Sequence, residues 1–150
     1  MTSTLTEQPA LSADACLCLA LRKAARVVTR SYDAAMAPHK LTSGQFSILA
    51  HITARSDFTL VALAEAMALD QSSLSRALRP LMRDGLVVLE CDVSDARRRL
   101  LVMTEAGRAR LIGARVAWAT AQTHAHSALG NGQLSALRDA LNILTQLPET

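Results

Sequence analysis

Aromatic residues are scarce in this chain of 150 residues, which contains one tryptophan, one tyrosine and two phenylalanines. Proteins that bind single-stranded nucleic acid or RNA loops use aromatic side chains as stacking platforms. This scarcity favours duplex DNA if the partner is a nucleic acid. Cysteine is also scarce, and the three cysteines are an odd number that does not suit a secreted disulfide framework.

Long apolar runs are absent as well, because no stretch approaches the length of a membrane span. The first residues lack the basic region, apolar run and cleavage site of a secretory signal. Nucleophile elbows, glycine-rich phosphate loops and zinc-hydrolase helix motifs are missing too. We therefore expect a cytoplasmic protein with reduced thiols, no membrane partner, no cofactor and no enzymatic activity.

Half of the residues are apolar, which is enough to bury a core in a single domain spanning residues 1–150. The formal charge is +3, and arginine supplies nearly all of the positive charge. The planar guanidinium group suits both phosphates and guanine edges. This balance is compatible with a nucleic-acid partner but does not prove one.

Apolar periodicity and capping residues predict four helices in the first part of the chain. A long helix over 12–37 would be capped by Ser12. Thr42 and Gln45 match a capping box for the second helix, and the third begins near Thr59. Asp70 caps the fourth helix, in which we expect Leu74, Leu78, Leu81 and Met82 to face inward, Pro80 to cause a bend or early loosening, and Gly85 to end the helix.

The second part of the chain predicts a hairpin and two more helices. Branched apolar residues at 86–91 and 99–103 flank a polar segment and indicate two short strands, with Cys91 a packing residue. Thr104 caps a long helix with an apolar stripe that includes Trp118, and residues 130–132 separate it from a last helix. The stripes of helices 12–37 and 105–147 predict dimerisation around a compact unit at 42–104. The alternative is that these helices fold back on that unit.

The fourth helix and the hairpin are the candidate DNA-binding elements. If the leucines face inward, a polar and basic face with Ser72, Arg76 and Arg79 points outward. The first turn of such a helix meets base edges, where glutamine can pair with adenine and arginine with guanine. A solvated face is the alternative reading for the helix alone, but three adjacent arginines in the hairpin favour DNA. The candidate contacts are Gln71, Ser72, Ser73, Ser75, Arg76, Arg79, Arg97, Arg98 and Arg99.

The order of these elements resembles the MarR family of bacterial transcription regulators over nearly the whole chain. The matching segments are LVALAE at 60–65, the helix at 70–81, DGLV at 84–87, DARR at 95–98 and LVMTEAG at 101–107. The resemblance implies a mainly α fold with a small β-hairpin: a winged helix-turn-helix, wing at 86–103, with N- and C-terminal dimerisation helices. It also implies a homodimeric repressor on a pseudo-palindromic operator in double-stranded DNA. By this resemblance 70–83 is the recognition helix, Arg97 enters the minor groove and Asp95 orients it. From the residues alone, one of the three arginines is expected to support the hairpin by pairing with Asp95 or Asp92.

The resemblance further implies a release signal, because family members respond to small aromatic or phenolic ligands, to thiol oxidation or, in a few cases, to metal. Candidates for a ligand pocket between the first two helices and the fifth are Tyr32, His39, His51 and Trp118. Cys16 and Cys18 are the redox candidates. Residues two positions apart on a helix point roughly 200° away from each other, so this pair cannot close an unstrained disulfide. Packing remains the alternative role for both thiols.

The histidine pair His124 and His126 has the same spacing and makes a poor local chelate, so no metal site is predicted, although zinc or copper held by distant residues stays open. Two other functions remain as alternatives to DNA binding. One is a thiol-based peroxidase, which would turn over peroxide with a thiol reductant. The other is a protein-interaction adaptor that does not bind DNA.

Overall fold

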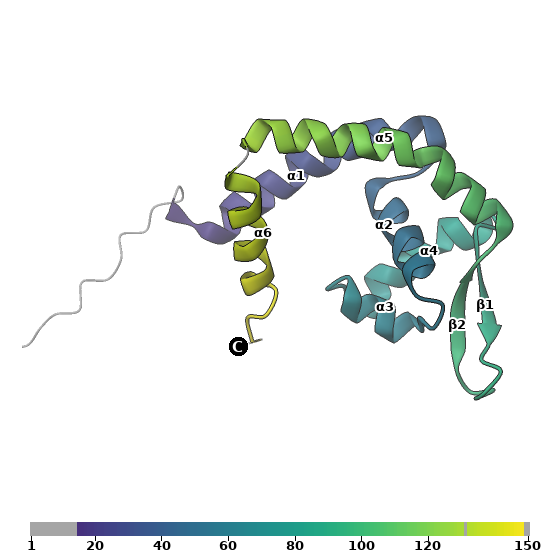
Figure 1. The fold of residues 1–150 in the computed structure, drawn as a ribbon. Coiled ribbons are helices and arrows are strands. Elements are labelled where there is room, and N and C mark those ends of the chain that lie inside the picture. The colour runs from purple at the N-terminus through teal and green to yellow at the C-terminus, as the bar shows by residue number, and fades with distance from the viewer. Residues whose placement is uncertain (1–14, 131, 149–150) are drawn as a thin grey trace, which may run out of the picture.

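The structure, a computed structural model, describes residues 15–130 and 132–148. Figure 1 shows two long helices lying side by side, with a compact unit at one end and a short helix at the other. In chain order the elements are α1 (Leu17–Met36), the short 3-10 helix η2 (Ala37–His39), α2 (Ser43–Ala54), α3 (Leu60–Ala66), α4 (Gln71–Arg83), β1 (Val87–Cys91), β2 (Arg99–Met103), α5 (Glu105–Leu129) and α6 (Gln133–Leu144). The mainly α fold with one hairpin is the predicted class.

Local capping sets the start of most helices, as the sequence predicts. The capping box of α2 is present, because the Gln45 amide donates to Thr42 Oγ1 over 3.1 Å and the Thr42 amide donates to Gln45 Oε1 over 2.9 Å. Thr59, Asp70 and Thr104 cap α3, α4 and α5. The cap of α1 is Cys16, and the predicted Ser12 cap lies outside the described residues.

Helix α4 continues through Pro80 to Arg83, so it does not loosen early at the proline. Leu74, Leu78 and Leu81 are buried as predicted, but Met82 is 38% exposed and the prediction for it was wrong. The three leucines define the centre of the buried stripe, and Met82 lies about 70° from that centre, at the edge of the stripe.

The hairpin is antiparallel, with Val87 opposite Met103 and Cys91 opposite Arg99. Burial falls along β1 from a fully buried Val87 to an exposed Cys91, because the strands run past the helices into solvent. The prediction that Cys91 is a packing residue was therefore wrong. The Leu101 amide donates to the Phe58 carbonyl over 2.8 Å, which ties β2 to the segment before α3.

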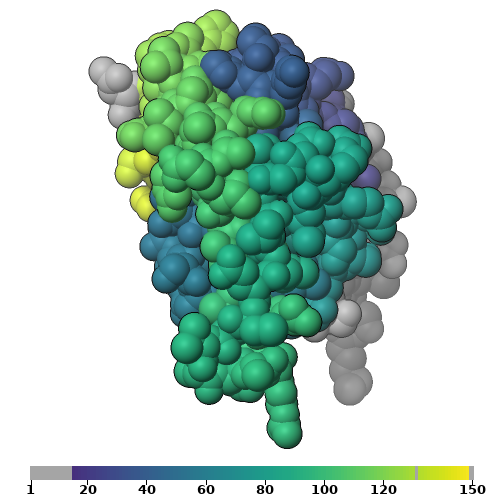
Figure 2. All heavy atoms as spheres, turned by 90° about the vertical axis from the view of Figure 1, so that its right-hand side faces the viewer, coloured from purple at the N-terminus to yellow at the C-terminus, as the bar shows by residue number. Residues whose placement is uncertain are grey.

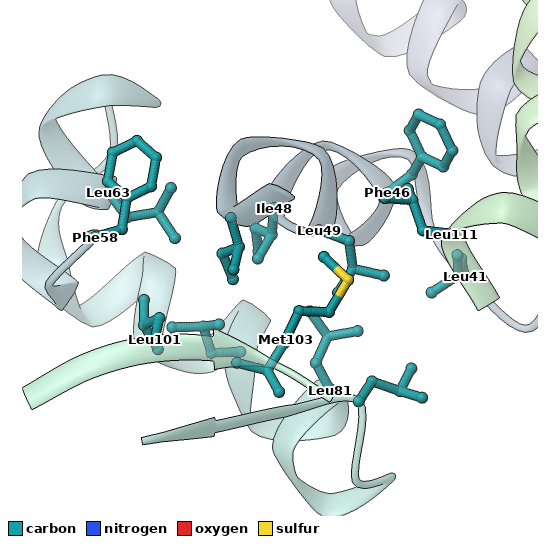
Figure 3. Close-up of a cluster of buried hydrophobic side chains, with 14 of the residues drawn as sticks. Leu41, Phe46, Ile48, Leu49, Phe58, Leu63, Leu81, Leu101, Met103 and Leu111 are labelled. Carbon is teal, nitrogen blue, oxygen red and sulfur yellow. The ribbon is translucent and has the colours of Figure 1, made fainter. Parts of the chain in front are cut away.

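The core lies where α2, α3, α4 and the hairpin meet (Figure 3). Ile48, Leu49, Leu63, Leu81 and Leu101 are each at most 1% exposed. Contact between these side chains from four elements stabilises the compact unit and fixes the position of α4 relative to the hairpin.

Helices α1, α5 and α6 leave much of their apolar surface outside this core. Met36 is the only buried residue of α1, and α6 has none. The exposed apolar side chains on these helices are Leu17, Leu19, Val27, Val28, Ile112, Val116, Trp118, Leu137, Leu141 and Ile143. Clustered apolar surface is typical of interaction sites.

Candidate nucleic-acid interface

The outer face of α4 is polar and open to solvent. Gln71, Ser72, Ser75, Arg76 and Arg79 are exposed on it, opposite the buried leucines. Ser73 is half-buried at the edge of this face. The structure thus brings all six α4 candidates onto one side of one helix.

The first turn of α4 is held by the Asp70 carboxylate. Its Oδ1 accepts from the Ser73 amide over 2.8 Å and also from the Ser72 hydroxyl, and its Oδ2 accepts from the Ser73 hydroxyl over 2.6 Å. Arg76 Nη2 in turn donates to Ser73 Oγ over 2.9 Å. The hydroxyl donors, Ser72 first, hold the pKa of Asp70 well below its ordinary value. The sequence predicted the cap, but not that both serine hydroxyls would bind it.

The hairpin tip is closed by Asp92. Its Oδ1 accepts from the Ser94 amide over 2.9 Å and from the Ser94 hydroxyl over 2.7 Å, while Oδ2 pairs with Arg98 Nη1 over 3.0 Å. The Ser94 hydroxyl, its amide and Arg98 lower the pKa of Asp92. The expectation that one arginine supports the hairpin is confirmed, and that arginine is Arg98.

Arg97 and Arg99 differ from Arg98. Within the described part of the chain, neither side chain makes an ion pair. Asp95 Oδ1 accepts from the backbone amide of Arg97 over 3.0 Å, so Asp95 shapes the turn and leaves the Arg97 guanidinium free. The hairpin projects beyond the body of the molecule in Figure 2, and it carries these exposed arginines into solvent.

Thr104 and Gly107 join the hairpin to α5. Thr104 Oγ1 donates to the Gly85 carbonyl over 2.7 Å, and the Thr104 amide donates to the Leu86 carbonyl over 3.1 Å. Gly107 packs so closely on Leu86 that a Cβ there would lie 2.1 Å from the Leu86 carbonyl oxygen. These contacts hold the start of α5 against the base of the hairpin.

The four ligand-pocket candidates do not share one site. Tyr32 lies in a groove between α1, α5 and α6, where its hydroxyl donates to Gln122 Oε1. His39 lines a separate hollow, and His51 Nδ1 lies 2.8 Å from the Ser47 carbonyl oxygen of its own helix. Trp118 stacks on Phe46 with ring centroids 5.7 Å apart. Residue type and helix number alone give no signal that separates these positions.

The hollow around His39 is the more polar of these sites. It has a volume of about 530 Å³ and lies between η2 and α5. His39, Lys40 and Arg110 line it, and Arg110 Nη1 donates to the His39 carbonyl over 3.3 Å. Among the described residues, no acidic side chain lines this hollow, which we call the η2–α5 hollow. Sequence reasoning missed Lys40 and Arg110 because they are far apart in the chain.

The groove that holds Tyr32 is mainly apolar. It has a volume of about 710 Å³ and its walls include Leu21, Val28, Leu137 and Leu141. Burial raises the pKa of Tyr32, and the nearby Arg138 guanidinium partly offsets this rise. We call it the α1–α5–α6 groove.

All three cysteines are exposed. Cys16 is the N-cap of α1, where its Sγ accepts from the Leu19 amide over 3.4 Å. Cys18 follows on the first turn of the same helix. Within residues 15–130 and 132–148, no group of three or more histidine, cysteine or acidic side chains is placed to hold a metal ion. No described helix is both long enough and apolar enough to cross a membrane.

Helices α2, α3 and α4 around a shared core, the polar outer face of α4 and the projecting hairpin define a winged helix-turn-helix protein. A model of the MarR family matches residues 41–98. The transcriptional regulator MosR of M. tuberculosis in complex with DNA is 34% identical over 87% of this chain and 94% of that one, with a TM-score of 0.78. The transcriptional repressor CouR bound to a 23-mer DNA duplex is 28% identical over 87% of this chain and 93% of that one, with a TM-score of 0.79.

A further solved structure is CouR from Rhodococcus jostii RHA1 bound to p-coumaroyl-CoA, which is 22% identical over 93% of this chain and 99% of that one, with a TM-score of 0.78. At this identity the likeness supports the fold alone. No curated protein sequence matches the chain. The chain belongs to the MarR family, and it is a transcriptional regulator of that family.

Proposed function

We propose that the chain forms a homodimer that binds a pseudo-palindromic operator in double-stranded DNA and represses transcription. In this arrangement α4 enters the major groove and the wing grips the backbone or minor groove beside it. The observation that carries the proposal is the exposed polar face of α4 joined to an exposed hairpin tip with a free arginine. The solved complexes of MosR and CouR with DNA support duplex DNA as the partner.

Each DNA-binding element has a distinct role in the proposal. Gln71, Ser75 and Arg76 face base edges from the first turns of α4, and Arg79 contacts phosphate. In the wing Arg97, which lies in the turn, supplies the electrostatic contact, and Arg99 begins the strand that follows. Arg98 shapes the tip through its ion pair with Asp92.

The salt dependence of duplex binding tests the role of Arg97. Removing one cationic contact lowers the slope of log affinity against log salt by about 0.9, so Arg97→Ala in a dimer lowers it by about 1.8. The control is Arg26→Ala, which removes the same charge from the exposed surface of α1, outside α4 and the hairpin. Equal slopes for wild type and Arg97→Ala would contradict the role of Arg97 in the wing. A similar fall for Arg26→Ala would mean that the change in slope reflects net charge and not a wing contact.

Operator binding and repression need their own measurement. Footprinting on the DNA upstream of the gene should protect two half-sites about one helical turn apart, as expected for two recognition helices related by a twofold axis. A reporter driven by that DNA should fall in activity when the protein is present. Protection of a single half-site would contradict the palindromic operator, and a rise in reporter activity would contradict repression.

The proposed dimer forms through the segments 12–37 and 105–147, and 42–104 forms the DNA-binding unit. The α1–α5–α6 groove and the exposed leucines of α6 support this division. Placing a charge there with Leu141→Asp should give a monomer in sedimentation equilibrium, because an unpaired carboxylate in an apolar interface is costly. Val61→Asp alters an equally exposed apolar side chain on α3 and should leave the dimer intact. A monomeric wild-type chain would refute the proposal.

We infer that a small acidic or phenolic ligand binds in the η2–α5 hollow and thereby causes the protein to release DNA. Lys40 and Arg110 supply positive charge, and the hollow lies where the end of α1 meets the start of α5. A panel of aromatic acids and phenols, titrated into the protein–DNA complex, should include a compound that releases the duplex. The substitution Lys40→Ala should raise the concentration required, whereas Lys23→Ala on the exposed surface of α1 should not.

The alternative signal is oxidation of Cys16. Cys16 is exposed at the N-cap of α1, so its thiol is accessible to peroxide. Peroxide should then release DNA from the wild type but not from Cys16→Ser. Release by an aromatic acid that persists in Cys16→Ser selects the ligand mechanism instead. Catalytic turnover of peroxide with a thiol reductant would favour the peroxidase alternative over a sensor.

A further inference from the structure

We propose that Asp70 is a positioning residue for base recognition, which acts through the Ser73 hydroxyl to hold the Arg76 guanidinium in one orientation. The inference rests on the proposed DNA-reading role of α4. The relay contains two consecutive hydrogen bonds, from Ser73 Oγ to Asp70 Oδ2 over 2.6 Å and from Arg76 Nη2 to Ser73 Oγ over 2.9 Å. All three residues lie within the N-cap and first two turns of the helix.

The direction of the relay follows from the number of hydrogens available. A serine hydroxyl has one hydrogen, and that of Ser73 is donated to Asp70. Only the lone pairs of Ser73 Oγ remain, so it can accept from Arg76 but cannot donate to a base acceptor. The Ser72 hydroxyl is committed to Asp70 in the same way. The carboxylate thereby occupies both hydroxyl hydrogens, and through Ser73 it supports one arginine.

Electrostatics reinforce the same geometry. Asp70 stays ionised well below neutral pH because the hydroxyls of Ser72 and Ser73 and the Ser73 amide all donate to it. The Arg76 guanidinium lies close enough to lower the pKa of Asp70 further. The charged Asp70 carboxylate, two hydrogen bonds away through Ser73, therefore attracts the Arg76 guanidinium toward the start of the helix.

Holding Arg76 matters because a free arginine loses rotamer entropy when it is fixed. The relay fixes part of that freedom before DNA arrives. Only one Arg76 bond is used within the described residues, which leaves guanidinium N–H groups to pair with the O6 and N7 acceptors of a guanine. A fixed guanidinium meets one base pair in each half-site, so it contributes sequence preference rather than general affinity.

The other arginines of α4 lack this arrangement. Arg83 pairs with its neighbour Asp84 over 2.9 Å at the far end of the helix. For Arg79, the described part of the chain provides neither a hydrogen bond nor an ion pair. Arg76 is thus the one arginine of α4 tied to the first turn, where recognition helices meet bases.

The test selects bound sequences from a pool of duplexes with a randomised centre and compares wild type with Ser73→Ala. Alanine suits a helix, so this variant keeps the fold and the Asp70 cap while it breaks the relay. Arg76→Ala should reduce the preference at one base pair per half-site about 5- to 150-fold. Ser73→Ala should reduce the preference at that same base pair at least threefold, and the double variant should be no worse than Arg76→Ala. Ser73→Thr restores a hydroxyl and should restore the preference.

Asp70→Ser keeps a good N-cap but removes the carboxylate, and it should reduce the sequence preference at the same base pair. Its control is Asp84→Asn, which changes the net charge of α4 equally and should leave that preference intact. Unchanged preferences in Ser73→Ala, or additive effects of Ser73→Ala and Arg76→Ala, would overturn this inference and leave the proposed function standing. Failure of the wild type to bind duplex DNA in a salt-dependent way would overturn both.

Discussion

Gly107 lies in the first turn of α5, where the helix crosses the base of the hairpin. A Cβ at this position would lie 2.1 Å from the Leu86 carbonyl oxygen and 2.8 Å from Met103 Cγ. Real Cβ contacts essentially never fall below 3.0 Å, so Gly107→Ala must move α5 and the hairpin apart by about 0.9 Å. A shift of this size strains the hydrogen bonds from Thr104 to the carbonyls of Gly85 and Leu86.

The cost can be assembled from its parts. Overpacking costs about 1–3 kcal/mol, and each weakened hydrogen bond adds about 0.5–1.5 kcal/mol. Against this, alanine improves helix propensity by at most about 1 kcal/mol. We expect Gly107→Ala to lower the free energy of unfolding by about 1–5 kcal/mol. For a chain of this size that corresponds to a fall in Tm of roughly 2–20 °C.

Thermal unfolding followed by circular dichroism, at one fixed protein concentration, measures the effect. Gly113→Ala is the matched control on the same helix, because its Cβ would meet only His39 Nδ1 at an ordinary 4.0 Å. This control should gain up to about 1 kcal/mol from helix propensity. Wild-type stability in Gly107→Ala, or an equal loss in Gly113→Ala, would refute the packing argument.

Three further predictions concern the core and the wing. Leu49→Ala, at a fully buried position, should lower the free energy of unfolding by about 2–5 kcal/mol in denaturant titrations, and a loss below 1 kcal/mol would mean that the core collapses around the gap. Because the folded-state pKa of Asp92 is lowered, mainly by the Ser94 hydroxyl, its carboxylate stabilises the fold above pH ~3.9 and stops doing so as pH falls through the folded-state value. The stability difference between wild type and Asp92→Asn should therefore be full at neutral pH and absent in strong acid, and a difference that persists there would argue against the carboxylate. The fluorescence of Trp118, the only tryptophan, should change in Phe46→Leu because the stacked ring is lost, and an unchanged spectrum would contradict the stack.

Elements set by neighbouring residues could be predicted from the sequence. The caps at Thr42, Thr59, Asp70 and Thr104 depend on bonds across three residues, so the local pattern contains all the information required. Inward faces followed from helical spacing in the same way. The error at Met82 arose at the edge of a stripe, where a single residue can face either the core or solvent.

Features that depend on long-range packing could not be predicted in this way. Cys91 is exposed because the hairpin extends past the helices, and nothing within the strand itself encodes how far it extends. The choice of Arg98 rather than Arg97 as the partner of Asp92 depends on the turn between β1 and β2. The separation of Tyr32, His39 and His51 likewise follows from how the helices pack.

The wing and the Asp70–Ser73–Arg76 relay are attached to different parts of the fold. The wing is held to the start of α5 through Thr104 and Gly107. The Asp70–Ser73–Arg76 relay lies entirely within α4 and its cap. Under the proposed function, a ligand that shifts α5 from the η2–α5 hollow would therefore change the position of the wing on the duplex and leave the relay intact. The proposals together predict that an effector changes how tightly the dimer binds, while the preferred base is set independently by the first turn of α4.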